Sequence, residues 1–197
     1  MPTEAINGGT NTKSLQDRRE AIAWLEAQRS ILVAAAGQAA DLHGDLEVAS
    51  YAWRLADALA PFFDNGKYII DWQTASQAGL RAARRVDDRE AEAQMLKRLG
   101  VVHAQLLQPE QAIRCFERSL EIFRELGNRR GAGEGWVFSN LAGAYMQIGR
   151  IDDVMSCLAQ SLEIFRDRRP IWRGNHTEQY WLRLHRGTQL RHRNWLS

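Results

Sequence analysis

Apolar residues in the second half of the chain recur every three or four positions, which is the spacing of one face of an α-helix. Three such faces follow one another: Leu96, Leu99, Val102 and Leu106, then Ala112, Ile113, Phe116, Leu120 and Phe123, then Val154, Met155, Leu158, Leu162 and Phe165. Apolar and polar residues nowhere alternate in the way that predicts a strand. With only four prolines in 197 residues, the pattern predicts an all-α protein.

The last two apolar faces belong to one repeated unit. The hexapeptide SLEIFR stands at residues 119–124 and again at 161–166, and the same 42-residue register places Leu99 on Leu141. Side-chain size is kept at nearly every position between these points. A copied structural unit explains such a repeat better than chance does.

Turn signals divide each unit into two helices. Pro109 suits the first position of a helix, and Gly149 suits the position just after a helix end. Asp152 and Asp153 then lie near the positive N-terminus of the next helix, which favours acidic residues. A single helix pair cannot bury both of its faces, so we expect stacked pairs that form a solenoid.

The repeated positions resemble the tetratricopeptide repeat (TPR) family. The family pattern is a Leu, a small residue, an aromatic residue, an Ala and a second aromatic residue at set spacings. The matching residues are Leu99, Gly100, His103, Ala112 and Phe116 in one copy and, more loosely, Leu141, Ala142, Tyr145, Val154 and Leu158 in the next. The resemblance implies a TPR-like α-solenoid of antiparallel helix pairs, although the unit here is longer than the one that the family usually has.

The whole chain is expected to form about three helix pairs. A degenerate first copy precedes the clear ones, with Gly66 falling on Gln108, and a helical segment over 17–43 comes before it. The predicted organisation is a flexible lead-in over 1–16, a helical repeat domain over 17–166 and an atypical C-terminal cap or tail over 167–197.

Two longer segments carry a narrower resemblance. Residues 23–63 look like the segment that joins the ATPase core to the TPR arm in large actinobacterial regulators, and residues 123–167 are similar to the repeats of that arm. These regulators are antibiotic-regulator and related signal-transduction ATPase proteins. The resemblance implies an arm that senses or binds a partner. The chain has no GxxxxGK phosphate-binding loop, so we expect no nucleotide hydrolysis.

The C-terminal stretch differs from the rest in charge. Residues 167–197 contain seven Arg, no Lys and two acidic residues, whereas residues 1–166 carry a net charge of −3. An amphipathic helix over 176–187, with Tyr180, Trp181 and Leu184 facing inward, would cap the stack. Contact with nucleic acid through Arg and Trp is the alternative, although the tail has no recognised reader motif.

The TPR resemblance also implies a binding surface, because the first helix of each pair lines the concave face. Residue-by-residue transfer names Gln94, Lys97, Arg98, Val101 and Gln105 in one repeat, and Trp136, Ser139, Asn140, Gly143, Met146 and Gln147 in the next. Asn140 can donate to and accept from a peptide backbone, and Lys97 and Arg98 can meet a carboxylate. The alternative is that these positions form an ordinary solvated helix face.

No set of residues indicates catalysis, a metal site or a cofactor. The five His residues show no trustworthy metal-ligand spacing, and the acid pairs stand where helix capping explains them. Cys115 and Cys157 occupy equivalent positions and are expected to be small buried hydrophobic residues. We therefore predict a protein that is not an enzyme.

The N-terminus has no secretory signal and no apolar run is long enough for a membrane span, which favours a cytoplasmic protein. The function hypothesis is a regulatory protein- or peptide-binding module that holds an extended segment on the concave face. Two alternatives stay open, a sensor of a small signalling peptide and nucleic-acid contact through the tail. A homodimer is also plausible, since an exposed solenoid end invites self-association.

Overall fold

The computed structural model describes residues 9–42, 46–127 and 132–167, and these residues form seven helices and no strand. The helices are α1 (Gly9–Asp41), α2 (Leu46–Gly66), α3 (Ile69–Arg85), α4 (Arg89–Gln105), α5 (Pro109–Glu125), α6 (Ala132–Gln147) and α7 (Ile151–Asp167). The predicted all-α fold is confirmed. The predicted cap over 176–187 lies outside the described residues.

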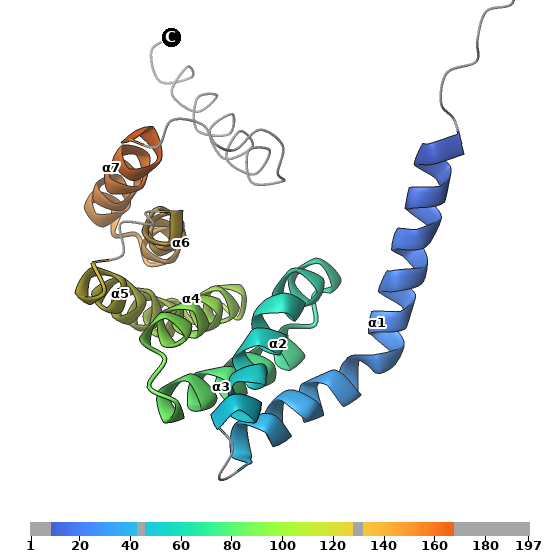
Figure 1. Ribbon diagram of the computed structural model, residues 1–197. Helices are drawn as coiled ribbons and strands as arrows, with labels where there is room; N and C mark the ends of the chain where they lie inside the picture. Colours follow the sequence, from blue (N-terminus) through green and yellow to red (C-terminus); the bar gives the residue numbers. More distant parts are fainter. Residues whose placement is uncertain (1–8, 43–45, 128–131, 168–197) are drawn as a thin grey trace, which may run out of the picture.

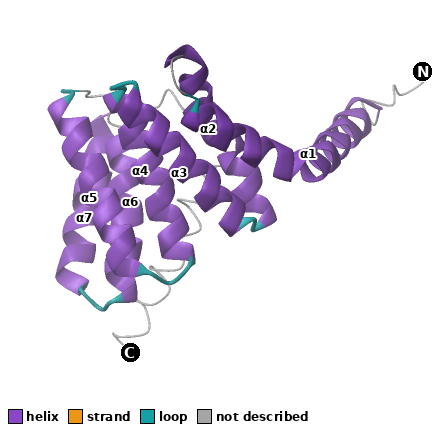
Figure 2. Cartoon of the chain, turned by 90° about the horizontal axis from the view of Figure 1, so that it is seen from below, coloured by secondary structure: helices purple, strands orange, loops and turns teal. Residues whose placement is uncertain are grey.

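The helices pack as three antiparallel pairs, α2–α3, α4–α5 and α6–α7, and α1 lies against the first pair. Figure 1 shows the pairs arranged in an arc, with α2, α4 and α6 on its inner side and α3, α5 and α7 on its outer side. Figure 2 shows the same helices running side by side while the N-terminal half of α1 projects away from them. The predicted solenoid of about three pairs is therefore present.

Local sequence sets the ends of these helices. Pro109 is the first residue of α5, and Asp88 caps α4 by accepting a hydrogen bond from the Ala91 amide at 2.9 Å. Gly149 has a φ of 73° in the turn before α7, a left-handed conformation that glycine adopts without steric cost. These turn residues agree with the sequence pattern.

The proposed register of the first copy needs a correction. Lys67 and Leu107 are the left-handed residues of equivalent turns, so Tyr68, and not Gly66, corresponds to Gln108. From Lys67 to Leu107 the chain advances 40 residues, against 42 from Leu107 to the next left-handed residue, Gly149, because the connection from α3 to α4 is shorter than the connection from α5 to α6. The expected boundary between a lead-in and a helix also differs, since α1 begins at Gly9 and not at residue 17.

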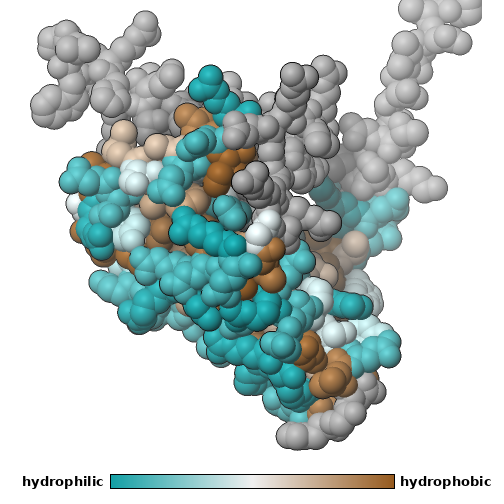
Figure 3. All heavy atoms as spheres, turned by 60° about the vertical axis from the view of Figure 1, so that its left-hand side comes forward, coloured by the Kyte–Doolittle hydropathy of each residue, from teal (hydrophilic) through white to brown (hydrophobic). Residues whose placement is uncertain are grey.

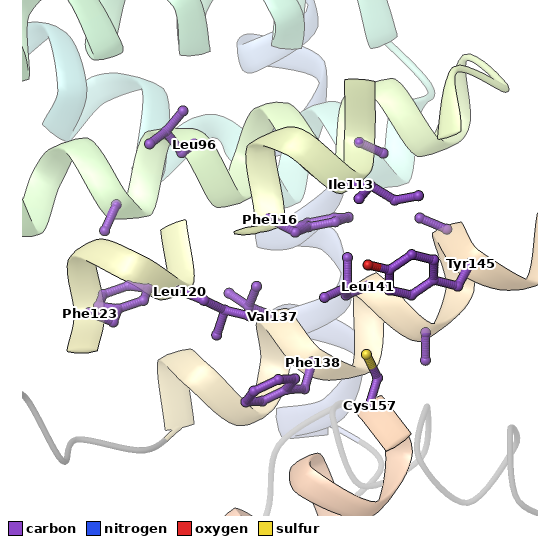
Figure 4. Packing of buried hydrophobic residues seen from close by; sticks show 14 of the residues in the cluster. Leu96, Ile113, Phe116, Leu120, Phe123, Val137, Phe138, Leu141, Tyr145 and Cys157 are labelled. Carbon is purple, nitrogen blue, oxygen red and sulfur yellow. The ribbon is translucent and has the colours of Figure 1, made fainter. Parts of the chain in front are cut away.

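Two large groups of buried residues hold the pairs together. One joins α4, α5, α6 and α7 around Phe116, Leu120, Val137 and Leu141 (Figure 4). The other joins α2, α3 and α4 around Phe63, Trp72 and Met95, with residues of α1 packed on its edge. Since α4 belongs to both groups, one continuous core runs through the stack.

The sequence assigns one apolar face to α7 that the structure buries only in part. Val154 and Cys157 are buried, but Met155, Leu158 and Leu162 are exposed to solvent. Within the described residues no further helix follows α7, so nothing in that part of the chain covers these three side chains.

Candidate binding face

Helices α4 and α6 carry the residues that the sequence predicted for binding. Gln94, Lys97, Arg98, Val101 and Gln105 lie on one side of α4, and each is half-buried. The opposite side of this helix is buried in the core. We call the accessible sides of α2, α4 and α6 the inner face, and α4 is its centre because it contacts both α2 and α6.

Two of the predicted residues on α4 are already bound to α2. Arg98 donates from Nε and a terminal nitrogen to Asp57 Oδ1, at 2.9 and 2.8 Å. Gln105 donates to Asp64 Oδ1 at 2.7 Å. These hydrogen bonds connect α2 to α4, the first helices of neighbouring pairs. Both side chains are therefore engaged within the protein when no ligand is bound.

Sequence reasoning missed the two aspartates, Asp57 and Asp64. The reason is that local sequence pattern does not specify the distance between two helices. A signal was available, since each aspartate precedes its partner by 41 residues, close to one repeat. Complementary polar residues one repeat apart therefore indicate contacts between successive first helices.

Lys97 differs from Arg98 in its partners. Its Nζ donates to Gln94 Oε1 on the same helix, and among the described residues no carboxylate forms an ion pair with it. Burial, together with the nearby charge of Arg98, lowers the pKa of Lys97 from 10.5 to about 8, against the smaller opposing effect of Asp57. An ammonium that has lost water without gaining an anion can be stabilised by a carboxylate.

The predicted residues of α6 divide into two sets. Trp136 packs edge-on against Phe165, with ring centroids 6.0 Å apart, and Ser139 shares a 2.7 Å hydrogen bond with Ser161, so both face α7. Gln147 donates to the Ala104 carbonyl at 3.2 Å and thus bridges to α4. Met146 and Gly143 are exposed and remain open to a partner.

Asn140 does not present a free amide. One N–H of its Nδ2 donates to the Trp136 carbonyl of its own helix at 2.9 Å. The amide still has its second N–H and the acceptor oxygen Oδ1, so the predicted double role as donor and acceptor stays a prediction.

A hollow lies on the outer side, between α5 and α7, and the sequence did not indicate it. It has a volume of about 390 Å³, with Phe138, Leu141 and Tyr145 of α6 among its lining. The Tyr145 hydroxyl donates to Glu117 at 3.0 Å, and burial followed by this bond raises the pKa of Tyr145 to about 12. The tyrosine therefore stays protonated and acts as a fixed structural contact.

Metal-ligating side chains and thiols are the other candidates for chemistry among the described residues. No group of three or more His, Cys, Asp or Glu among them could hold a metal ion. Cys115 and Cys157 are free thiols whose pKa burial raises, which makes them less reactive. No described helix has the length and apolarity that crossing a membrane requires.

Comparison with known proteins agrees with this architecture. Residues 90–167, which span α4 to α7, match the tetratricopeptide repeat family. No curated protein matches the sequence. TPR repeats generally mediate interactions between proteins.

Proposed function

We propose that the TPR segment binds an extended peptide or protein segment on its inner face, with Lys97 as the anchor for a carboxylate of the partner. The observation that carries the proposal is the state of Lys97, half-buried, with a pKa lowered to about 8 and no carboxylate paired with it among the described residues. Bringing a carboxylate to this ammonium offsets the cost of its burial. Arg98, by contrast, already holds Asp57.

The surroundings of Lys97 suit an extended chain. Asn140 offers an acceptor oxygen for a backbone N–H, and Met146 offers an exposed apolar contact on the neighbouring first helix. The side chains that bridge α2, α4 and α6 make the inner face rigid, which lowers the entropy lost on binding. Of the remaining predicted contacts, Gln94 and Val101 would border the bound segment, whereas Trp136 and Ser139 face α7 and would not touch it directly.

The experiment compares peptides that differ only in one charge. Peptides selected from a random library on the full chain are synthesised with a free C-terminal carboxylate and as the C-terminal amide. We expect Lys97→Met to weaken the carboxylate peptides about 10- to 100-fold, the usual worth of a charge-assisted hydrogen bond. Its effect on the amides should be small.

Arg114→Met is the matched control, because Arg114 is an exposed cation of α5 on the outer side of the arc. It removes the same charge from the protein without touching the inner face. If Lys97→Met and Arg114→Met lose the same affinity for the carboxylate peptides, the net charge of the protein explains the effect. If Lys97→Met loses the same affinity for carboxylate and amide peptides, Lys97 is not the anchor.

We further propose that the module serves a regulatory protein. This rests on the resemblance of residues 23–63 and 123–167 to the partner-sensing arms of actinobacterial regulators. A ligand that acts as a signal should stabilise the folded chain increasingly as its concentration rises. A melting temperature that stays constant across saturating concentrations of the selected peptides would contradict a sensing role.

A further inference from the structure

The last described helix, α7, exposes an apolar stripe. Met155, Leu158 and Leu162 lie on one side of it, with 64%, 37% and 51% of their surfaces accessible, and Ile151 extends the stripe to the start of the helix. Figure 3 turns this side of the molecule forward and shows hydrophobic patches among hydrophilic residues. A row of four large apolar side chains on one helix is typical of a surface that another element covers.

The same positions are buried one repeat earlier. In the 42-residue register Ile113, Phe116 and Leu120 of α5 correspond to Met155, Leu158 and Leu162, and their accessible fractions are 9%, 0% and 4%. Part of this covering comes from α6, the first helix of the next pair, whose Val137 and Leu141 lie in the same buried group (Figure 4), and Gly100 of α4 lies against Phe116. The exposed stripe therefore has the composition and position of a seat for one more helix.

We propose that the C-terminal segment of this same chain occupies that seat, with Tyr180, Trp181 and Leu184 in the places that Val137, Phe138 and Leu141 take on α5. Both triplets have the spacing i, i+1 and i+4, which puts three large apolar residues on one side of a helix. This assignment extends the stack by one covering helix at its C-terminal end.

The length of the connection suits this placement. The stretch from Glu125, the end of α5, to Val137 is nearly as long as the stretch from Asp167, the end of α7, to Tyr180. The chain can therefore return to α7 in the same way as it returns to α5. It also continues beyond Leu184 through residues 185–197, which is far enough to complete the covering helix.

Charge favours the same occupant. The segment 167–197 carries +5, and the rest of the chain carries −3, so the two attract each other at short range. The segment is also tethered to the end of α7, which gives it an effective concentration on the order of millimolar at the stripe. A second copy of the chain has to compete with this tethered segment.

The test measures amide hydrogen exchange along the full chain. Light scattering measures the molar mass under the same conditions. In the native chain we expect residues 180–184 to exchange at least about tenfold more slowly than unstructured chain, in a monomer. Met155→Asp combined with Leu162→Asp places two charges in the seat and should abolish this slowing. These side chains are exposed, so the substitutions leave the core of the stack intact.

The matched control is Ser156→Asp combined with Gln160→Asp, which adds the same two charges to the side of α7 that borders α5, outside the stripe. In this control variant the amides of residues 180–184 should exchange as slowly as in the native chain. Unprotected 180–184 in the native monomer would overturn the proposal. Protection that disappears on dilution together with a dimeric mass would also overturn it, in favour of a second copy.

Discussion

At the scale of single residues, two residues in contact change size in opposite directions from one repeat to the next. Gly100 of α4 lies against the ring of Phe116 in α5, and an added Cβ would come within 2.4 Å of that ring. In the next repeat the equivalent pair is Ala142 and Leu158, a larger residue opposite a smaller one. Total volume is thus conserved where the first and second helices of a pair cross.

Substitution of Gly100 should therefore destabilise the protein. Phe116 is fully buried and its ring lies where the added Cβ would come, so Gly100→Ala should lower the free energy of unfolding by about 1–3 kcal/mol through overpacking. Gly143→Ala is the control, because Gly143 is exposed in α6 with nothing within 4 Å of an added Cβ. Helix propensity predicts a gain of about 0.5–1 kcal/mol there. Urea unfolding of both variants measures the two changes, and equal signs would contradict the packing explanation.

Lys97 should make stability depend on alkaline pH. Its folded-state pKa of about 8 lies below the ordinary 10.5, so between these values the unfolded chain binds more protons and the free energy of unfolding rises with pH. Lys97→Met removes the buried charge and should stabilise the protein at pH 7, by on the order of 1 kcal/mol.

Urea unfolding at pH 7 and pH 9.5 tests this prediction. The advantage of Lys97→Met over the native chain should shrink at the higher pH, where the native lysine is largely neutral. An advantage that is constant with pH would mean that packing, and not charge, explains the difference.

At the scale of helices, one buried carboxylate joins three elements. Glu92 of α4 accepts hydrogen bonds from Arg84 at the end of α3 and from Arg89, and Arg89 also pairs with Glu125 at the end of α5. Burial alone would raise the pKa of Glu92, but the bonds from Arg84 and Arg89 outweigh it and lower the pKa below 4.5. The network fixes the junction between two successive pairs.

Removal of this charge should weaken the junction. Glu92→Gln keeps the shape but loses the anion, and we expect a loss of about 2–4 kcal/mol at pH 7. Because the folded-state pKa is lowered, the native chain loses the same stabilisation as the pH falls below 4.5, so the two proteins should converge in acid. Thermal unfolding between pH 3 and 7 measures this. Glu121→Gln, which breaks an exposed pair with Arg118, should cost less than about 0.5 kcal/mol at any pH.

Helix boundaries were predictable wherever a residue acts locally. The sequence indicates such residues directly, because each acts within one turn of the helix that it begins or ends, as Pro109, Gly149 and Asp88 do. The degenerate first repeat was misplaced because its turn has no proline or glycine at the decisive position. Lys67 adopts the left-handed conformation there, beside backbone hydrogen bonds from Lys67 to Asp64 and from Tyr68 to Phe63.

At the scale of the whole molecule, stability should fall from the centre of the stack to its ends. The central helix α4 packs against α2, α3, α5 and α6, whereas residues 16–24 of α1 are exposed on every side. In a solenoid each unit is stabilised mainly by its neighbours. Local opening therefore costs the most free energy in the middle of the stack.

Native-state hydrogen exchange checks this gradient. We expect the slowest amides in α4 and α5 and the fastest helical amides in residues 16–24, because an unsupported helix opens at a cost close to zero. Proline substitution in the exposed part of α1 should leave the protection of α4 unchanged. Slow exchange in residues 16–24 at high dilution would contradict this order.

The sequence by itself determined the all-α class, the repeat, the pairing of helices and the side of α4 that stays out of the core, because periodicity and turn chemistry act over a few residues. Only the tertiary structure decided how the polar residues on that side are used. Arg98 and Gln105 hold α2, while Lys97 is left without a carboxylate among the described residues. A hydrogen bond between repeats depends on the distance between two helices that local pattern does not specify. The same reason separates the buried Leu120 from the exposed Leu162, since identical hexapeptides differ only in what the fold places beside them.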